Sequence, residues 1–174
     1  MFMSVCAFSI MDLVVKWSES YPLGQVIFFR GFFGVLLYFL IMPRDRIKNF
    51  YYTKRPGLHF LRCFFGLIAL LAIFTALRNL PLATVVSISF AAPIFTTILS
   101  IFLLSEKVGF FRWLAVIVGF IGIIIITEPG FTSLNIYFIY PVIFCLGMSY
   151  VAITIRQLST SEPVWLISLY FSIT

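Results

Sequence analysis

Long runs of apolar residues, separated by short polar stretches, dominate this chain of 174 residues. A helix needs about 20 residues to cross a hydrocarbon core of roughly 30 Å, and most of the runs approach that length. A backbone inside lipid must satisfy its own hydrogen bonds, which favours helices, and the runs lack the alternation of a transmembrane barrel. The pattern predicts six spans and the start of a seventh, at 1–15, 24–42, 58–77, 83–104, 110–127, 136–155 and 165–174.

The composition supports this membrane interpretation. Hydrophobic residues make up 62% of the chain and charged residues only 10%, against about 25% charged in a typical soluble domain. The net charge of +6 raises nucleic acid as a partner, but the basic residues lie in loops between apolar runs. Clustering at one membrane face explains them better, so we expect a lipid bilayer and no nucleic acid as partner.

The loops alternate in charge. One set, 43–57, 105–112 and 156–163, carries eight basic residues, which are Arg44, Arg46, Lys48, Lys54, Arg55, Lys107, Arg112 and Arg156. The other set, 16–23, 78–82 and 128–135, carries only Lys16 and Arg78. The positive-inside rule therefore predicts a multi-pass protein of the inner (plasma) membrane with a cytoplasmic N-terminus and with Glu128 outside. Such short loops also predict that consecutive helices are antiparallel neighbours in a compact bundle.

A weak internal echo suggests how the spans are organised. Residues 9–22 and 149–163 both show an apolar run, a basic helix end, the dipeptide Ser-Glu and a proline, about 140 residues apart. Five spans separate the two copies, so the copies would enter the membrane from opposite sides, as in the inverted repeats of secondary transporters. We therefore predict an all-α membrane protein, a polytopic helical bundle with one five-helix repeat (1–127) and the start of a second, inverted repeat (136–174).

Several motifs resemble those of EamA-type transporters of the drug/metabolite transporter superfamily. They are the segment 76–83 (ALRNLPLA), Pro93, 104–107 (LSEK), the pair Arg112-Trp113, Gly119, Gly122, and the stretches 11–16 and 28–31. Ala115 departs from the glycine often found just after the Arg-Trp pair. The resemblance implies ten helices in two inverted repeats that export or import small metabolites. We therefore expect this chain to be the first half of such a transporter and a little of its second half.

Two ionisable residues fall within predicted spans, where a charge is costly and marks a functional candidate. Arg30 lies roughly 10 Å inside the outer end of its span, although a snorkelling arginine is an alternative interpretation. Asp12 shares a helical face with Lys16, four residues on, and its side chain is too short to snorkel. The first span leaves the membrane where the second enters, so both residues should lie at similar depth. We expect Asp12 and Arg30 to pair across adjacent helices, or to share a polar cavity with substrate.

The fourth predicted span contains Pro93 together with the hydroxyl residues Ser87, Ser89, Thr96 and Thr97. Serine and threonine can satisfy the carbonyl that a proline leaves without a partner, which gives these side chains a structural role. The alternative is a kinked helix that lines the transport pathway. On that alternative Ser87, Ser89 and Pro93 join Asp12 and Arg30 as candidate substrate-binding residues.

Other residues have mainly structural interpretations. We expect His59 and Arg62 to lie at the membrane interface, and Glu106 with Lys107 to form either a helix-end charge cluster or a gating element. Gly119 and Gly122 should allow close helix contact. Cys6, Cys63 and Cys145 should be buried free thiols, since no metal-binding or disulfide spacing is present.

The leading functional hypothesis is a secondary, non-ATP-driven transporter of small polar metabolites that works by alternating access between inverted repeats. The sequence contains no catalytic triad, metal motif or phosphate-binding loop, so we expect no enzymatic activity, cofactor or metal. The alternatives are a non-transporting polytopic membrane protein, such as an assembly factor or intramembrane enzyme, and a channel. A homodimer is a further arrangement that the sequence leaves open.

Overall fold

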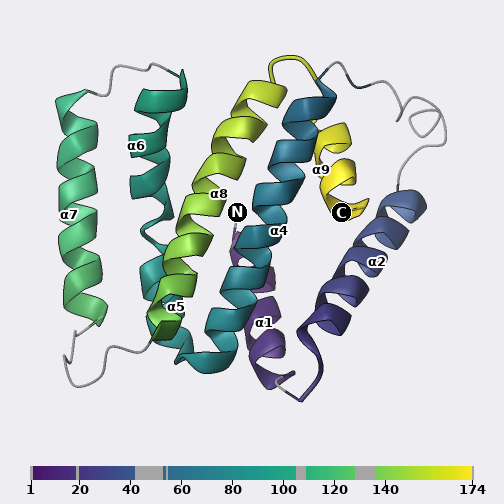
Figure 1. The fold of residues 1–174 in the computed structure, drawn as a ribbon, viewed down its shortest axis with the longest axis horizontal. Coiled ribbons are helices and arrows are strands. Elements are labelled where there is room, and N and C mark those ends of the chain that lie inside the picture. Colours follow the sequence, from purple (N-terminus) through teal and green to yellow (C-terminus); the bar gives the residue numbers. More distant parts are fainter. Residues whose placement is uncertain are drawn as a thin grey trace.

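The computed structural model of the chain describes residues 2–18, 20–41, 53, 55–104, 109–127 and 136–173, which are helical and hold no β-strand. The helices, labelled as in Figure 1, are α1 (Phe2–Trp17), α2 (Leu23–Ile41), α4 (Pro56–Asn79), α5 (Leu82–Ser89), α6 (Ala92–Leu104), α7 (Phe110–Thr127), the 3-10 helix η1 (Ile136–Phe138), α8 (Ile139–Leu158) and α9 (Val164–Ile173).

The helices confirm the predicted all-α, polytopic membrane architecture. Three stretches of the described chain are long and apolar enough to cross a membrane: Pro56–Asn79, Leu82–Leu104 and Ile136–Leu158. Shorter apolar helical stretches are Leu23–Leu37 and Trp113–Gly122. Half of the ten basic residues counted for orientation, Lys107 among them, lie outside the described residues, as do Glu106 and Glu128. The predicted orientation and the inverted repeat therefore stay predictions.

The fourth predicted span is interrupted near its middle. Helix α5 ends at Ser89 and α6 begins at Ala92, because Pro93 has no N–H with which to bond the carbonyl of Ser89. The thiol of Cys145 on α8 lies 3.3 Å from the carbonyl oxygen of Ile88 and 3.8 Å from that of Ser89. The hydroxyl of Ser149, one turn later, lies 2.9 Å from the carbonyl oxygen of Ala92 and 2.6 Å from that of Cys145 in its own helix. Helix α8 thus brings two polar side chains to the break.

The most extensive packing joins helices that are distant in sequence. Helix α8 lies between α4 and α6, and its contact with α4 is the largest in the described chain (Figure 1). Helix α9 packs against α2 and α4, while α1 packs mainly against α4 rather than α2. The expectation that consecutive helices are neighbours holds for α6 and α7, and α1 and α2 share one hydrophobic cluster, although their larger contacts are with α4 and α9 respectively. A short loop brings two helix ends together, but the apolar faces decide which helices pack.

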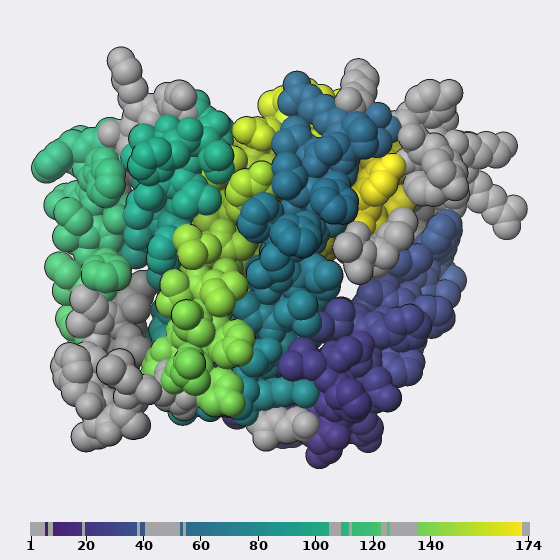
Figure 2. All heavy atoms as spheres, viewed as in Figure 1, coloured from purple at the N-terminus to yellow at the C-terminus, as the bar shows by residue number. Residues whose placement is uncertain are grey.

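Glycine allows the closest helix contact, but not the glycines that we expected. A Cβ atom added at Gly147 on α8 would lie 2.9 Å from the Cβ of Ala69 and 3.0 Å from the carbonyl oxygen of Phe65, both on α4. The nearest atom to such a Cβ at Gly119 is 4.0 Å away, and none lies within 4 Å at Gly122. The prediction for Gly119 and Gly122 is therefore wrong, and the close contact lies between α4 and α8, which form one continuous surface in Figure 2.

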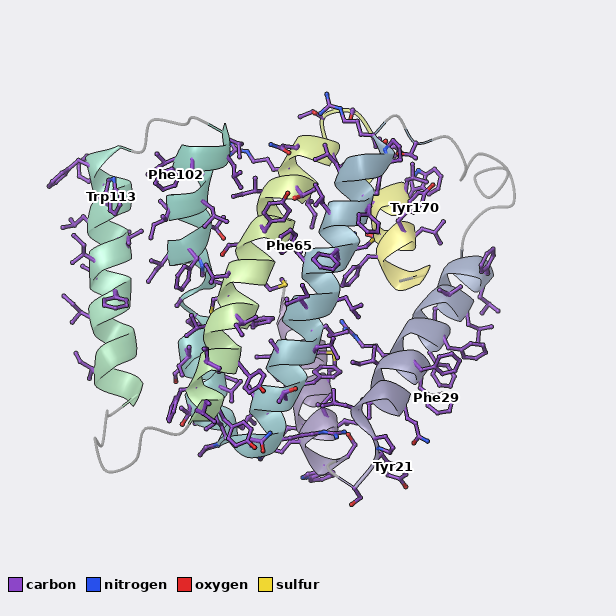
Figure 3. All side chains as sticks on the ribbon, viewed as in Figure 1. Tyr21, Phe29, Phe65, Phe102, Trp113 and Tyr170 are labelled. Carbon is purple, nitrogen blue, oxygen red and sulfur yellow. The ribbon has the colours of Figure 1, made fainter. Side chains whose placement is uncertain are left out.

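The buried core and the exposed surface are both apolar, as expected for a bundle in lipid. Phe74 and Leu77 on α4 are fully buried and pack with Val15 of α1 and Val85 of α5. Large apolar side chains also cover the outer faces, and Figure 3 shows Phe29 projecting from α2 away from the other helices. Cys63 and Cys145 are buried as predicted, whereas Cys6 is exposed and contradicts that prediction.

Candidate functional site

A cavity of about 410 Å³ lies among α1, α2, α4, α5, α8 and α9. Three of its lining residues are polar: Asp12, Arg30 and Ser89. The rest of the wall is apolar and includes Met11, Phe74, Phe90, Phe144, Met148 and Phe171. A mostly apolar cavity with a few polar groups is typical of a small-molecule site.

The packing of α1 and α2 on α4 places the two charged groups at this cavity. On α1, Val15 is buried against the core, and Asp12 lies one turn earlier on the same face. On α2, the guanidinium carbon of Arg30 lies 5.9 Å from the centre of the Phe74 ring, within the range of a cation–π contact. Both charged side chains are half-buried. The fold thus keeps a carboxylate and a guanidinium within the bundle.

Asp12 and Arg30 share the cavity but do not form a direct pair. No salt bridge or hydrogen bond joins them, and neither has such a bond to any other residue in the described part of the chain. Of the two arrangements that the sequence predicts for these residues, the structure therefore has the shared cavity. Among the described residues neither charge is used in a hydrogen bond or salt bridge, so both can bind a ligand.

The other candidate residues divide between the cavity and the helix break. Ser89 lines the cavity, whereas Ser87 is buried outside the lining and Pro93 is exposed. The hydroxyls of Ser87 and Ser89 donate to the carbonyls of Ala83 and Val85, four residues earlier, at 2.8 and 2.7 Å. Thus the structure brings Asp12, Arg30 and Ser89 together at the cavity. Ser87 and Pro93 lie outside its lining, where Ser87 bonds within α5 and Pro93 lies at the break between α5 and α6.

The C-terminal end of α4 is held by a residue of α1. The ammonium of Lys16 donates to the carbonyls of Leu77 at 2.9 Å and Leu80 at 3.1 Å, which lie at the end of α4. The guanidinium of Arg78 donates to the carbonyl of Ser18 at 3.1 Å, just beyond α1. A cation at a helix C-terminus is favoured by the helix dipole. These bonds fix α1, and with it Asp12, against α4.

The N-terminal end of α4 is held by Glu162, which lies in the turn between α8 and α9. Its Oε1 accepts a hydrogen bond from the hydroxyl of Thr53 at 2.7 Å and one from the N–H of Arg55 at 3.3 Å. Its Oε2 is hydrogen-bonded to Nε2 of His59 on the first turn of α4. The side chains of His59 and Glu162 are only 3% and 2% exposed. In the sequence, Glu162 stands out only as part of the repeated Ser-Glu-Pro pattern. Its burial could not be predicted, because a loop has no hydrophobic periodicity that would indicate which side chains are buried.

The two residues that we expected at the membrane interface are both buried at this end. The ring of His59 lies against that of Tyr170 on α9, tilted by 37° with the centroids 4.6 Å apart. Arg62 is 6% exposed, donates to the carbonyl of Ile167 at 2.8 Å and lies over the Phe171 ring at 5.0 Å. Both residues face α9, which covers the side of α4 that would otherwise reach the interface.

Comparison with known proteins bears directly on the cavity. The profile of the EamA-like transporter family matches residues 1–128, which include Asp12, Arg30 and Ser89. The chain belongs to the EamA-like transporter family. This confirms the resemblance seen in the sequence motifs.

Curated relatives of this EamA-like chain are named as transporters. S-adenosylmethionine uptake transporters of Rickettsia prowazekii (strain Madrid E) and Rickettsia bellii (strain RML369-C) are 30% and 34% identical to it, over 98% and 80% of the chain and 58% and 48% of the relative. A pseudopaline exporter of Pseudomonas aeruginosa (strain UCBPP-PA14) is 27% identical over 94% of the chain and 58% of its own length. The chain thus spans about half the length of the curated relatives it matches. No solved structure matches the chain significantly.

The EamA-like match ends at residue 128, one residue beyond the end of α7. Helices α8 and α9 lie outside it, yet they line the same cavity through Phe144, Met148 and Phe171. The cavity is therefore shared between the family unit and the segment that follows it.

Proposed function

We propose that this chain carries the substrate-binding cavity of a secondary, non-ATP-driven transporter for small zwitterionic metabolites. The substrates have an ammonium group, a carboxylate and a bulky apolar or aromatic remainder, as amino-acid derivatives do. The observation that carries this proposal is the pair of charges, Asp12 and Arg30, which line one cavity without bonding to each other. In a mostly apolar wall, each charge gains most from a ligand group of opposite sign.

The names of the relatives support this substrate class. S-adenosylmethionine, named for the Rickettsia relatives, carries an ammonium and a carboxylate on one carbon, a sulfonium cation in the middle and an aromatic base at its far end. In our proposal Asp12 binds the ammonium and Arg30 binds the carboxylate. The aromatic walls, such as Phe144 and Phe171, pack against the remainder.

The mechanism that we propose is alternating access between inverted repeats. The segment after α1 meets the C-terminal end of α4 through Ser18, whereas its echo after α8 meets the N-terminal end of α4 through Glu162. Placement of the two echoed segments at opposite ends of one helix is what an inverted repeat requires, and it supports this part of the proposal. The proposed repeats are 1–127 and 136–174.

The proposal places the protein in the inner membrane with its N-terminus in the cytoplasm, which the basic loops support. The substrate crosses without chemical change and without a cofactor, and nucleic acid has no part in the process. A homodimer is compatible with this mechanism. A channel or an assembly factor is less well supported, since neither needs two unpartnered opposite charges in one cavity.

Counterflow in liposomes tests the proposed function. Liposomes that contain the protein and are loaded with unlabelled S-adenosylmethionine should take up labelled S-adenosylmethionine at a rate that saturates with concentration. Ser89→Ala should change the half-saturating concentration, whereas Ser87→Ala should not, because both hydroxyls bond in the same way but only Ser89 lines the cavity. A flux that rises linearly without saturation would indicate a channel and contradict the proposal.

A further inference from the structure

A second buried polar cluster lies at the N-terminal end of α4, apart from the substrate cavity. Its centre is the hydrogen bond between His59 on α4 and Glu162 in the turn between α8 and α9. Burial of an ionisable pair is costly unless both groups are well bonded. This cost suggests that the pair has a role beyond joining two helices.

The hydrogen bonds of the cluster define where protons lie. Glu162 receives donors on both oxygens, from Thr53 and Arg55 on Oε1 and from His59 on Oε2, which is the pattern that favours an ionised carboxylate. Nε2 of His59 therefore carries a hydrogen. Nδ1 of His59 is buried and has no hydrogen-bonding partner among the described residues. Glu162 thus fixes the imidazole so that Nδ1 is the atom at which a second proton can bind.

Other charged and titratable groups near this end lie on the elements packed around His59. They are Arg62 and Cys63 on α4, Tyr170 on α9, Arg156 on α8 and Arg55 before α4. Apart from Glu162, these groups are cationic or neutral. With Nδ1 protonated, the imidazolium and the carboxylate cancel each other, so a bound proton leaves the pair electrically neutral.

Cavities that share lining residues lie along α4 between His59 and the substrate site. His59 lines a cavity of about 440 Å³ together with Cys63, Leu67 and Tyr170. Cys63 and Leu67 also line a second cavity of about 450 Å³, which Arg30 borders. Arg30 in turn lines the substrate cavity. A change in how α4 packs at His59 therefore alters residues that border the substrate site.

We propose that Nδ1 of His59 is a proton-binding site, in which Glu162 fixes the imidazole and the bound proton holds α4 against the turn between α8 and α9. Proton binding turns the neutral imidazole into an imidazolium, and the hydrogen bond to Glu162 becomes an ion pair. The proton thus adds a charge–charge attraction to a bond that the ionised carboxylate already strengthens. By linkage, proton binding and closure of the contact favour each other: the proton stabilises the closed contact by the same free energy by which the closed contact stabilises the bound proton.

Opening of this contact releases the proton. Water enters, the Nδ1–H bond breaks, and the proton passes to water as hydronium, leaving a neutral imidazole and a hydrated carboxylate. No electrons are exchanged. The charge of the loops places this end of α4 on the cytoplasmic side, so each opening would deliver one proton to the cytoplasm. This role in transport rests on the function proposed above, whereas the proton site itself does not.

Nuclear magnetic resonance of the imidazole tests the proton site directly. His59 is the only histidine in the chain, so labelling with ¹⁵N-histidine reports on this ring alone. When the pH is lowered from 8 to 5, we expect Nδ1 to gain a proton while Nε2 stays protonated. In Glu162→Gln the fixed tautomer should be lost. A bare Nε2, or an Nδ1 signal that does not change over this range, would overturn the proposal.

Transport driven by a proton gradient tests the coupling. With the membrane potential clamped at zero, a gradient of one pH unit should hold about a tenfold substrate ratio across the liposome membrane if one proton moves per substrate. His59→Gln, whose amide can still donate to Glu162, should equilibrate substrate without any ratio. Cys63→Ser, in the same cavity, should keep the ratio.

The outcomes separate the two proposals. If His59→Gln also holds the tenfold ratio, His59 does not couple protons and the inference is wrong. If the unmodified protein shows no counterflow at all, the transport function fails, and the resonance experiment still decides whether His59 and Glu162 bind a proton. That spectrum needs only the unmodified protein, so a variant that fails to fold does not affect it.

Discussion

The two ends of α4 are held by side chains of opposite charge. At the C-terminal end the ammonium of Lys16 bonds two carbonyls, and at the N-terminal end the carboxylate of Glu162 accepts from the N–H of Arg55. Each charge has the sign that the helix dipole favours at its end. Both arrangements therefore satisfy backbone groups at a helix end that would otherwise have no hydrogen-bonding partner within the helix.

The difference lies in what surrounds each charge. Lys16 is half-buried, and the hydrogen bonds described above join its ammonium to two backbone oxygens. Glu162 is buried and shares its carboxylate with the imidazole of His59. Under the proposals above, the end of α4 held by Glu162 is the one that opens.

The largest effect is expected at the buried end. Glu162→Ala removes the acceptor for Thr53, Arg55 and His59 and should lower the free energy of unfolding by about 3–5 kcal/mol. Unfolding by SDS in mixed micelles measures this. Glu162→Gln keeps an oxygen for Thr53 and Arg55 and should lose clearly less. Equal losses for both variants would show that these donors contribute little.

The next largest effect on the free energy of unfolding is expected where α8 packs against the middle of α4. In Gly147→Ala the new methyl would meet Ala69 and the carbonyl of Phe65, so the pair of α4 and α8 must move apart. Such overpacking should cost about 1–3 kcal/mol in the same unfolding measurement. Gly122→Ala is the matched control, because no atom lies near that position. A cost at Gly122 that equals the cost at Gly147 would contradict the assigned contact.

A smaller effect is expected at the Lys16 end. Lys16→Met removes two bonds to the carbonyls of Leu77 and Leu80, and partial exposure of the ammonium should limit the loss to about 1 kcal/mol. Lys16→Arg retains donors and should lose less. The loss for Lys16→Met should be smaller than the loss for Glu162→Ala, because the ammonium is partly exposed and the carboxylate is buried. If the two losses are equal, the two ends do not differ as we describe.

The smallest effect is expected at the break between α5 and α6. Ser149→Ala removes the hydroxyl that donates to the carbonyl of Ala92 and should cost about 0.6 kcal/mol, the average for hydrogen bonds between membrane helices. Ser159→Ala removes an exposed hydroxyl bonded to the carbonyl of Arg156 and should cost nothing measurable. A loss at Ser149 no greater than that at Ser159 would mean that the break needs no donor from α8.

The sequence predicted the spans well, because hydrophobic length is a local property. It located the proline break and the two membrane-embedded charges for the same reason, since each is visible in one segment. The packing of α8 between α4 and α6 could not be predicted, because apolar helices carry little information about which faces meet. Gly147 illustrates this: its small size matters only because Ala69 lies opposite it.

The candidate site was predictable in part. Asp12 and Arg30 were found from the cost of charge in lipid and from their similar depth, and the structure places them at one cavity. Ser87 and Ser89 differ only in the direction of their side chains, which the sequence did not resolve. Glu162 and His59 meet across a sequence separation of 103 residues, which no local pattern reveals.

The central claim is that Asp12 and Arg30 bind opposite charges of one zwitterion. The direct test is the affinity of the reconstituted protein for S-adenosylmethionine and for its decarboxylated analogue. The analogue should bind roughly 10- to 100-fold more weakly to the unmodified protein and to Asp12→Asn, because a charge-assisted bond to Arg30 is lost. Arg30→Gln should bind both compounds equally. If Arg30→Gln distinguishes them as strongly as the unmodified protein does, Arg30 does not bind the carboxylate and the claim is wrong.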